Sequence, residues 1–506
     1  MLNFKENIDP RHDFSYFYAK IELEMIKKII VCCLIGLLSA GFLLAKEPVK
    51  VAGYDITITI KGYPNKKLYL GYYFGDKQYL RDSAITDKTG KMNFKGPKDL
   101  EGGVYLVATP DKNLLFDFVV TEQFFSLETD SVDVIQNMKI KGSPENDVFF
   151  NYTKYTTKMG ANAMKLEEKL KEAKEKNDTT QTRILTEEYR KITNDLMDYR
   201  KNLMTQYPNF LISKIFKLMI DIDVPPAPRN NKGEIIDSNF QYLYYYNHYF
   251  DNFDWSDSRI VRTPVFHQKF EYFMLKLTPQ IPDSIIKSSD IVLKMAEPGK
   301  ENFKYCLYWI TNHYETSSYM GMDRVFVYMI DQYYAKGKAF WIDETLLFKM
   351  KDRADQLRQN LLGAKGPNLT MLDTNNVYHS LYNLKAKYTL LIFWDANCGK
   401  CKEEMLKLKT LYDSLNVKGA KERMFEVFGV SLTPDSKEWL KYLRENKLKW
   451  LNVYDPNNET NFRRHYDIYS TPVLYLMDEN KKIIAKRLNV DQLKEFIKDN
   501  EKIMAK

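Results

Sequence analysis

Residues 393–405 read FWDANCGKCKEEM, and this stretch decides the fold of the C-terminal part of the chain. It contains Cys398 and Cys401, two of only five cysteines among 506 residues. The run KYTLLIFWDA (387–396) is almost continuously apolar, as in a strand covered on both faces. The segment KEEMLKLKTLYDSL (402–415) carries an apolar face at helical spacing. The pair is therefore predicted to lie where a buried strand passes into a helix.

The spacing of the two cysteines predicts a redox couple. At the first turn of a helix, Cys398 would lie near unpaired backbone N–H groups and the positive end of the helix dipole, which favour a thiolate. Cysteines in such positions have pKa values lowered from ~8.5 to about 3.5–7.5. Cys398 is then the candidate nucleophile that attacks a substrate disulfide, and Cys401 the candidate that resolves the mixed disulfide.

Two other uses of the pair fit the sequence less well. A structural zinc ion needs four ligands, commonly including a second cysteine pair or two histidines. The C-terminal unit holds no further cysteine, and its histidines, His379 and His465, are far from the motif in sequence. A disulfide that served only as a staple would close too small a loop to constrain the chain. We therefore expect no metal and no cofactor other than a redox-active Cys398–Cys401 disulfide.

Strand-like and helical patterns alternate around the motif. After a linker marked by Gly363, Gly366 and Pro367, residues 366–506 are predicted to form one mixed α/β domain. The strand-like runs beyond the motif are MFEVFGVSL (424–432) and the two halves of YSTPVLYLMDENKKIIAKRL (469–488), and the helical runs are SKEWLKYLREN (436–446) and DQLKEFIKDN (491–500).

These segments resemble the thioredoxin superfamily, and most of all its exported members of the TlpA and ResA kind. The resemblance rests on SLYNLKAKYTLLIFWDANCGKCKEEM (380–405) and YSTPVLYLMDENKKIIA (469–485). It implies a thioredoxin fold and thiol–disulfide oxidoreductase activity. It also implies that Pro472, after Thr471, follows a cis peptide bond, lies against the two cysteines and holds the substrate strand.

The resemblance also suggests further site residues and shows departures from the family pattern. Exported relatives carry a glutamate three residues after the second cysteine, here Glu404, which is expected to exchange a proton with Cys401. Trp394 fits the family strand and, with Gly399 and Lys400, is expected to contribute to substrate binding. Asn397 stands where the family usually has tryptophan, and Ile392 stands where thioredoxin has a buried aspartate. Lys400 replaces the usual proline and is expected to lower the pKa of Cys398, so both substrate choice and redox direction stay open.

The N-terminal region has the layout of a secretory signal. Lys27 and Lys28 precede an apolar run over residues 29–44, which is short for a membrane span. Because residues 1–24 are polar, we expect translation to start at Met25, or else the segment to remain as a signal anchor. Residues 1–45 are thus predicted to direct the chain to the periplasm or cell envelope. The order of a sandwich, a helical segment and a thioredoxin-like domain, described next, resembles that of exported multidomain proteins of Gram-negative bacteria, which implies such a source.

Two further domains are predicted between the signal and the redox unit. Residues 46–145 contain short runs rich in valine, isoleucine, threonine, tyrosine and phenylalanine, and are expected to form an antiparallel β-sandwich that serves folding or docking. Residues 146–362 are expected to be all-α, beginning with a helical hairpin whose second helix ends at Pro208. Three histidines of this region, His248, His267 and His313, lack metal-ligand spacing and are expected to be structural.

The composition narrows the choice of partners. The net charge of +8 comes from 75 basic and 67 acidic residues, and no basic block is interleaved with aromatics, so nucleic acid is not an expected partner. We expect protein thiols and disulfides as substrates, with reduction the favoured direction, and a membrane electron donor or acceptor. The alternative is an envelope binding or scaffold protein in which the thioredoxin-like domain is ancillary or degenerate; the dense aromatics of the middle region motivate it.

Overall fold

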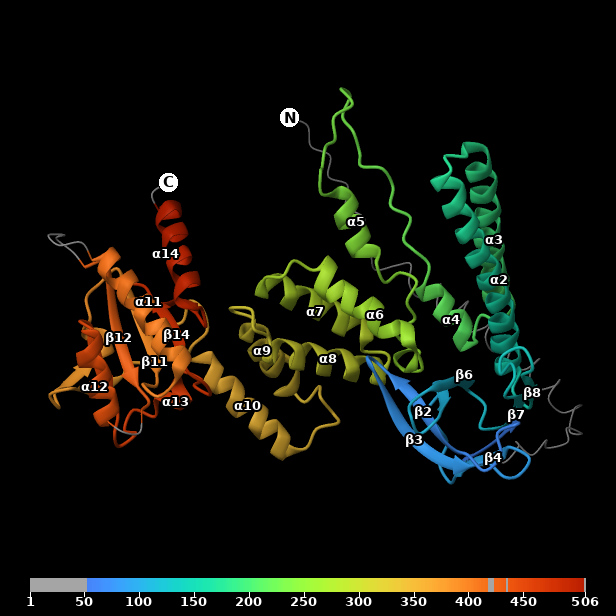
Figure 1. The fold of residues 1–506 in the computed structure, drawn as a ribbon, viewed down its shortest axis with the longest axis horizontal. Helices are drawn as coiled ribbons and strands as arrows, with labels where there is room; N and C mark the ends of the chain where they lie inside the picture. Colours follow the sequence, from blue (N-terminus) through green and yellow to red (C-terminus); the bar gives the residue numbers. More distant parts are fainter. Residues whose placement is uncertain (1–51, 417–422, 434–435, 505–506) are drawn as a thin grey trace, which may run out of the picture. The chain divides into compact units, whose positions relative to one another are not determined.

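The computed structural model describes residues 52–416, 423–433 and 436–504 (Figure 1). The predicted signal segment and the proposed start at Met25 lie outside the described residues. Within those ranges, no helix combines the length and the apolar character that a bilayer crossing requires.

The N-terminal domain is rich in strands, which form two four-stranded sheets (Figure 1). In several strands alternate residues are buried because successive side chains point to opposite faces, and both sheets contribute residues to one hydrophobic cluster. One sheet has the order β4-β1-β7-β8, with β1 (Tyr54–Lys61), β4 (Lys91–Gly96), β7 (Phe124–Asp130) and β8 (Lys139–Lys141). The other has the order β3-β2-β5-β6, with β2 (Lys67–Phe74), β3 (Lys77–Ile85), β5 (Gly103–Ala108) and β6 (Leu114–Val120).

One strand pair departs from the predicted antiparallel arrangement. β1 and β7 run parallel, with Ile56 opposite Phe125. The expectation that the sheets are antiparallel throughout is therefore wrong for this pair. Residue patterns could not reveal it, because the two strands are separated by more than sixty residues of chain and alternate in burial as antiparallel strands do.

The predicted helical hairpin is present as α2 (Pro144–Glu175) and α3 (Thr179–Gln206), which pack against each other. Each helix has a side-chain cap at its start: Ser143 accepts from the backbone N–H of Asn146, and Asp178 accepts from that of Gln181. The second helix ends before Pro208, as predicted. The buried amide of Asn146 also bonds both backbone groups of Val119, which ties the hairpin to β6.

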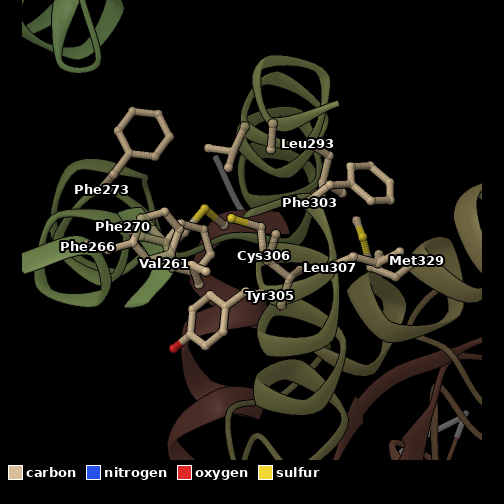
Figure 2. Packing of buried hydrophobic residues seen from close by; sticks show 14 of the residues in the cluster. Val261, Phe266, Phe270, Phe273, Leu293, Phe303, Tyr305, Cys306, Leu307 and Met329 are labelled. Atoms are coloured by element: carbon tan, nitrogen blue, oxygen red, sulfur yellow. The ribbon is translucent and has the colours of Figure 1, made fainter. Parts of the chain in front are cut away.

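The remaining helices of the middle region enclose an aromatic core (Figure 2). Cys306 is fully buried there, and burial raises its pKa, so it behaves as a small core residue. His267 bonds the Tyr305 hydroxyl at 2.8 Å, and the ring of His313 stacks on Trp309. The elements are α4 (Leu211–Leu218), α5 (Phe240–His248), η1 (Ile260–Arg262), α6 (Pro264–Tyr272), η2 (Phe273–Leu277), α7 (Pro282–Ala296), α8 (Lys300–Glu315), α9 (Asp323–Met329), η3 (Ile330–Tyr334) and α10 (Glu344–Arg358).

The C-terminal domain is a seven-stranded mixed sheet with helices on both faces. Its order is β10-β9-β13-β12-β11-β14-β15, with β9 (Thr370–Asp373), β10 (Tyr378–Ser380), β11 (Tyr388–Trp394), β12 (Phe425–Ser431), β13 (Leu451–Tyr454), β14 (Val473–Met477) and β15 (Ile483–Lys486). The helices are η4 (Leu381–Asn383), α11 (Gly399–Leu415), α12 (Ser436–Asn446), α13 (Phe462–His465) and α14 (Val490–Met504).

The central strand β11 explains why the motif sits where it does. All seven of its residues are buried, as the apolar run predicted. Leu390 and Ile392 face a core shared with α11, α12 and α14, whereas Leu391 and Phe393 face a second core that includes α13. The strand is thereby held from both faces, and its carboxyl end delivers the two cysteines to a fixed edge of the sheet.

Candidate active site

Cys398 caps the N-terminus of α11. The Cys398 sulfur accepts a hydrogen bond from the backbone N–H of Cys401 at 3.3 Å. The backbone carbonyl of Cys398 accepts one from the backbone N–H of Lys402. The pair therefore lies at the junction of a buried strand and a helix, as predicted from the sequence. At such a junction the free N–H groups of the first helical turn can stabilise a thiolate.

The two cysteines differ in exposure and in acidity. Cys398 is partly exposed, whereas Cys401 is fully buried. Burial alone would raise the pKa of Cys398, but hydrogen bonds from the thiol and the backbone N–H of Cys401 lower it below its usual value. For Cys401, burial and the neighbouring Cys398 sulfur raise the pKa to about 11. At neutral pH the first cysteine is therefore the better nucleophile, and the second stays protonated.

Thr471 and Pro472 lie beside this pair, as the resemblance implied. The Thr471–Pro472 peptide is cis. The Thr471 carbonyl oxygen is 4.0 Å from the Cys398 sulfur. Hydrogen bonding from the Thr471 side chain contributes to lowering the pKa of both cysteines. The structure thus brings together Cys398, Cys401, Thr471 and Pro472 from segments seventy residues apart.

Glu404 is buried in α11, but its carboxylate is engaged away from the sulfurs. One oxygen accepts from the backbone N–H of Val490 at 2.7 Å, and the other lies 3.4 Å from Lys407 Nζ. Within the described ranges, no hydrogen bond joins Glu404 to Cys398 or Cys401. A proton transfer from Cys401 to this carboxylate therefore needs a movement of the side chain or an intervening water.

The other predicted site residues fall into two groups. Gly399 and Lys400 are exposed at the start of α11, where a substrate could reach them. Lys400 contributes its backbone N–H to the lowered pKa of Cys398. Trp394 is fully buried and its ring packs on Tyr442 of α12, so the expectation of substrate contact is corrected: its size and position place it in the core under the motif.

Tyr442 is a neighbour of the site that the sequence did not reveal. Its hydroxyl donates to the carbonyl of Lys402 at 3.1 Å, and its pKa is raised by burial and by the nearby Cys401. Only an amphipathic helix pattern marked this residue in the sequence, and that pattern does not indicate which side chain lies close to the cysteine motif.

The described residues contain no group of three or more histidine, cysteine or acidic side chains arranged to bind a metal ion. His379 pairs with Asp373 at 3.1 Å, and His465 bonds the side chain of Gln359 at 2.5 Å. Both histidines are thus engaged outside the cysteine motif.

Comparison with known families divides the chain into three matched regions. A family described as thioredoxin-like matches residues 386–483. Two families described as domains of unknown function, DUF4369 and DUF5106, match residues 54–149 and 169–360. No curated protein matches the chain.

Several solved structures are similar to parts of this chain. A domain of a possible thiol-disulfide isomerase from Cytophaga hutchinsonii is 44% identical over 96% of its length and 29% of this chain, with a TM-score of 0.26. The thioredoxin domain of a thiol-disulfide oxidoreductase from Bacteroides vulgatus is 30% identical over 96% of its length and 27% of this chain, with a TM-score of 0.25. A thioredoxin-like protein from Bacteroides caccae is 21% identical over 97% of its length and 54% of this chain, with a TM-score of 0.42.

The family model covers the strand, the cysteine motif and the Thr471–Pro472 loop together, and the Cytophaga domain is matched along almost its whole length. The C-terminal part of this chain therefore belongs to the thioredoxin-like family of oxidoreductases.

Proposed function

We propose that the protein is an exported thiol–disulfide oxidoreductase that exchanges disulfides with protein substrates through Cys398 and Cys401. The observation that carries this proposal is the opposite shift of the two pKa values: lowered for the accessible Cys398 and raised to about 11 for the buried Cys401. Such a pair attacks with one sulfur and keeps the other in reserve as a thiol.

The reduction of a substrate disulfide would take two steps. The Cys398 thiolate attacks one sulfur of the substrate disulfide, forms a mixed disulfide, and releases the other substrate sulfur as a thiolate. Cys401 then loses its proton and attacks the Cys398 sulfur, which forms the Cys398–Cys401 disulfide and releases the second substrate sulfur. Two electrons pass to the substrate, two protons complete its two thiols, and the oxidised pair needs a dithiol donor to return to the reduced state.

The neighbouring residues take supporting roles in this proposal. Glu404 accepts the proton of Cys401 during the second step, after leaving one of its present hydrogen bonds. Thr471 and Pro472 hold the substrate strand beside Cys398, and the exposed Gly399 and Lys400 form the opposite side of the entrance. This division of roles is supported by the carbonyl of Thr471, which faces the Cys398 sulfur.

Reduction is the direction that we favour, with a membrane electron donor restoring the dithiol. The buried Glu404 next to the cysteine motif supports this direction. The lowered pKa of Cys398 acts in the opposite direction, because it stabilises the reduced pair and so favours oxidation of the substrate. For the location, we propose the periplasm or cell envelope of a Gram-negative bacterium. The predicted signal and the Bacteroides and Cytophaga sources of the similar structures support it.

We also propose the domain division expected from the sequence: a signal or anchor at residues 1–45, a β-sandwich at 46–145, a helical domain at 146–362 and the redox domain at 366–506. The family matches to 54–149, 169–360 and 386–483 support these limits. The sandwich is supported by the hydrophobic cluster that both N-terminal sheets share. We propose that it serves folding or docking.

The second candidate is an envelope binding protein with an ancillary redox domain. The aromatic richness of the middle region favours it, because most of a pocket of about 460 Å³ there is lined by aromatic and apolar side chains. The two candidates differ in what the cysteines contribute. Under the second, the variant Cys398→Ser would leave the partner interaction unchanged.

The equilibrium reduction potential of the cysteine pair tests the first candidate. The full chain is equilibrated in thiol–disulfide buffers of defined potential, alkylated, and analysed on the peptide that carries residues 398 and 401. A value near the ~−270 mV of thioredoxin indicates a reductant, and a value near ~−120 mV indicates an oxidant. Insulin reduction should be lost in Cys398→Ser and kept in the control variant Cys306→Ala. If no Cys398–Cys401 disulfide forms at any potential, the proposed mechanism is wrong.

A further inference from the structure

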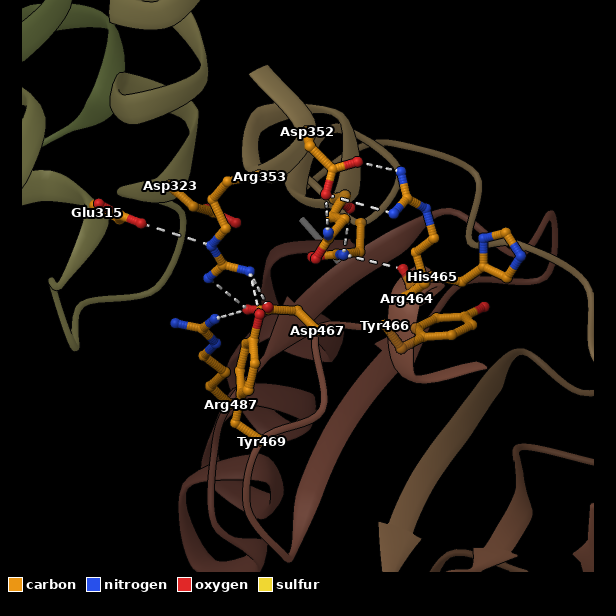
Figure 3. A network of polar contacts seen from close by, with 12 residues as sticks. Glu315, Asp323, Asp352, Arg353, Arg464, His465, Tyr466, Asp467, Tyr469 and Arg487 are labelled. Carbon is orange, nitrogen blue, oxygen red and sulfur yellow. Dashed lines mark hydrogen bonds and ion pairs between the residues drawn. The ribbon is translucent and has the colours of Figure 1, made fainter. Parts of the chain in front are cut away.

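A buried carboxylate stands close to the redox site in the segment that leads to it. Asp467 lies between α13 and Thr471, and its side chain has no exposed area. Two arginines from distant parts of the chain converge on it: Arg353 from α10 and Arg487, which directly follows β15 (Figure 3). A buried carboxylate held by two guanidinium groups fixes the backbone that carries it, because losing either contact would remove part of the charge pairing that offsets its burial.

Arg353 contacts this segment at two points. Its guanidinium donates to both carboxylate oxygens of Asp467, and it also donates to the Tyr469 hydroxyl at 3.3 Å while lying over the tyrosine ring. The Arg353 Nε lies 3.7 Å from a carboxylate oxygen of Glu315 in α8, so a second ion pair orients the arginine side chain. One residue of the helical region therefore holds positions 467 and 469, just before Thr471.

The strand that follows Pro472 is tied into the same network. Arg487 pairs with Asp467 through its side chain, and its backbone N–H donates to the carbonyl of Leu474 at 2.9 Å. The segment on either side of the Thr471–Pro472 peptide is thus attached to the Asp467 carboxylate. Thr471 lies between these attachments, with its carbonyl oxygen 4.0 Å from the Cys398 sulfur.

Other contacts join the same elements without reaching this segment. Asp352 of α10 pairs with Arg464 of α13, and the Asn360 side chain donates to the carbonyl of His465 at 3.1 Å. These contacts hold α10 against α13 but end before residue 467. Removing one of them weakens the packing of the two elements while leaving Arg353 on Asp467, which makes Asp352 a matched control.

We propose that Arg353 is a positioning residue for the redox pair: by holding Asp467 and Tyr469, it sets where Thr471 stands against Cys398. The inference deepens the function proposed above, since it assumes that Cys398 is the reacting sulfur. It also assigns a role to the helical region, because α10 supplies the side chain that shapes a site on another part of the chain. Sequence patterns did not suggest this role, since Arg353 is one of several charged residues on an ordinary amphipathic helix.

The test compares Arg353→Met with Asp352→Asn and with the unchanged protein. Methionine keeps an unbranched apolar stem but has no donor, and Asp467 keeps Arg487 as a partner, so the variant should fold. The readout is the rate at which iodoacetamide modifies residue 398 at each pH. If Thr471 moves away from Cys398, its side chain no longer contributes to lowering the pKa of Cys398, so the midpoint should rise by about half a pH unit in Arg353→Met, which is about threefold less thiolate below the midpoint. Asp352→Asn should leave the midpoint unchanged.

A double-variant cycle with Thr471→Val decides whether Arg353 acts through Thr471. If it does, Arg353→Met adds no further shift once Thr471→Val has removed the threonine hydroxyl. In a protein that keeps Thr471, Arg353→Lys should shift the midpoint less than Arg353→Met does. Independent, additive shifts would overturn the proposal, as would equal shifts in Arg353→Met and Asp352→Asn. The alkylation profile needs no turnover, so an inactive protein with the expected profile would refute the proposed function and still support the positioning role.

Discussion

Replacing Cys401 by alanine tests the electrostatics of the site most directly. In the structure, the thiol of Cys401 and its backbone N–H both stabilise the Cys398 thiolate, and the pKa of about 11 keeps Cys401 protonated as a donor. The variant Cys401→Ala removes the thiol donor and leaves the backbone donor in place. We therefore expect the pKa of Cys398 to rise, without returning fully to that of an unperturbed thiol.

The size of the rise follows from the strength of one hydrogen bond. A hydrogen bond to a charged group contributes about 1.5–3 kcal/mol, and the weak S–H donor should contribute less, about 1 kcal/mol. One pKa unit corresponds to about 1.4 kcal/mol, which gives a rise of roughly 0.7 units. Because Cys398 is partly exposed, solvent screening should reduce the rise toward about half a unit.

The measurement is the pH dependence of alkylation of the reduced protein, followed by mass spectrometry on the peptide that carries residue 398. Cys306 is fully buried and should stay unmodified while the protein is folded. The control is Cys401→Ser, whose hydroxyl keeps a donor at the same place and should shift the midpoint less. A midpoint in Cys401→Ala that is unchanged or lower would show that the thiol of Cys401 does not stabilise the thiolate.

Two further predictions use matched pairs of variants. Glu404→Gln should slow the second step of substrate reduction about tenfold or more, measured as the decay of the mixed disulfide. The control Glu403→Gln, at an exposed position, should have little effect, and equal decay rates in the two variants would show that Glu404 does not accept the proton. Gly75→Ala should destabilise the protein by about 2–5 kcal/mol, because Gly75 has φ +59° and an added Cβ would overlap the Tyr305 ring. Gly160→Ala should stabilise the protein by about 0.5–1 kcal/mol, because Gly160 lies in α2 with open space around an added Cβ. Urea unfolding followed by fluorescence and circular dichroism measures both, and a Gly75→Ala midpoint equal to that of the unchanged protein would contradict the packing seen here.

The segments with strong local patterns were predictable. The apolar run of β11 and the apolar face of α11 placed the cysteines at a strand–helix junction, and the structure confirms this. The helical hairpin was also predicted correctly. These features depend on residues within one or two turns of each other, so a linear pattern contains the necessary information.

Pairings between distant segments were less predictable. The parallel pairing of β1 with β7 was missed because either direction satisfies the same alternation of buried and exposed residues. Trp394 was expected near the substrate, but its side of the strand faces the core, and the direction of a side chain at the end of a strand depends on what packs there.

The sequence by itself predicted two cysteines at the start of a helix, because the strand and helix patterns around them are local. The roles of the downstream Thr-Pro pair and of the glutamate one turn into the helix came from the resemblance to a known family. Only the tertiary structure decided how they are used. It set the opposite pKa shifts of Cys398 and Cys401, turned Glu404 toward Val490, and joined Arg353 to Asp467, since burial, charge pairing and hydrogen-bond geometry arise between residues that the chain brings together only on folding.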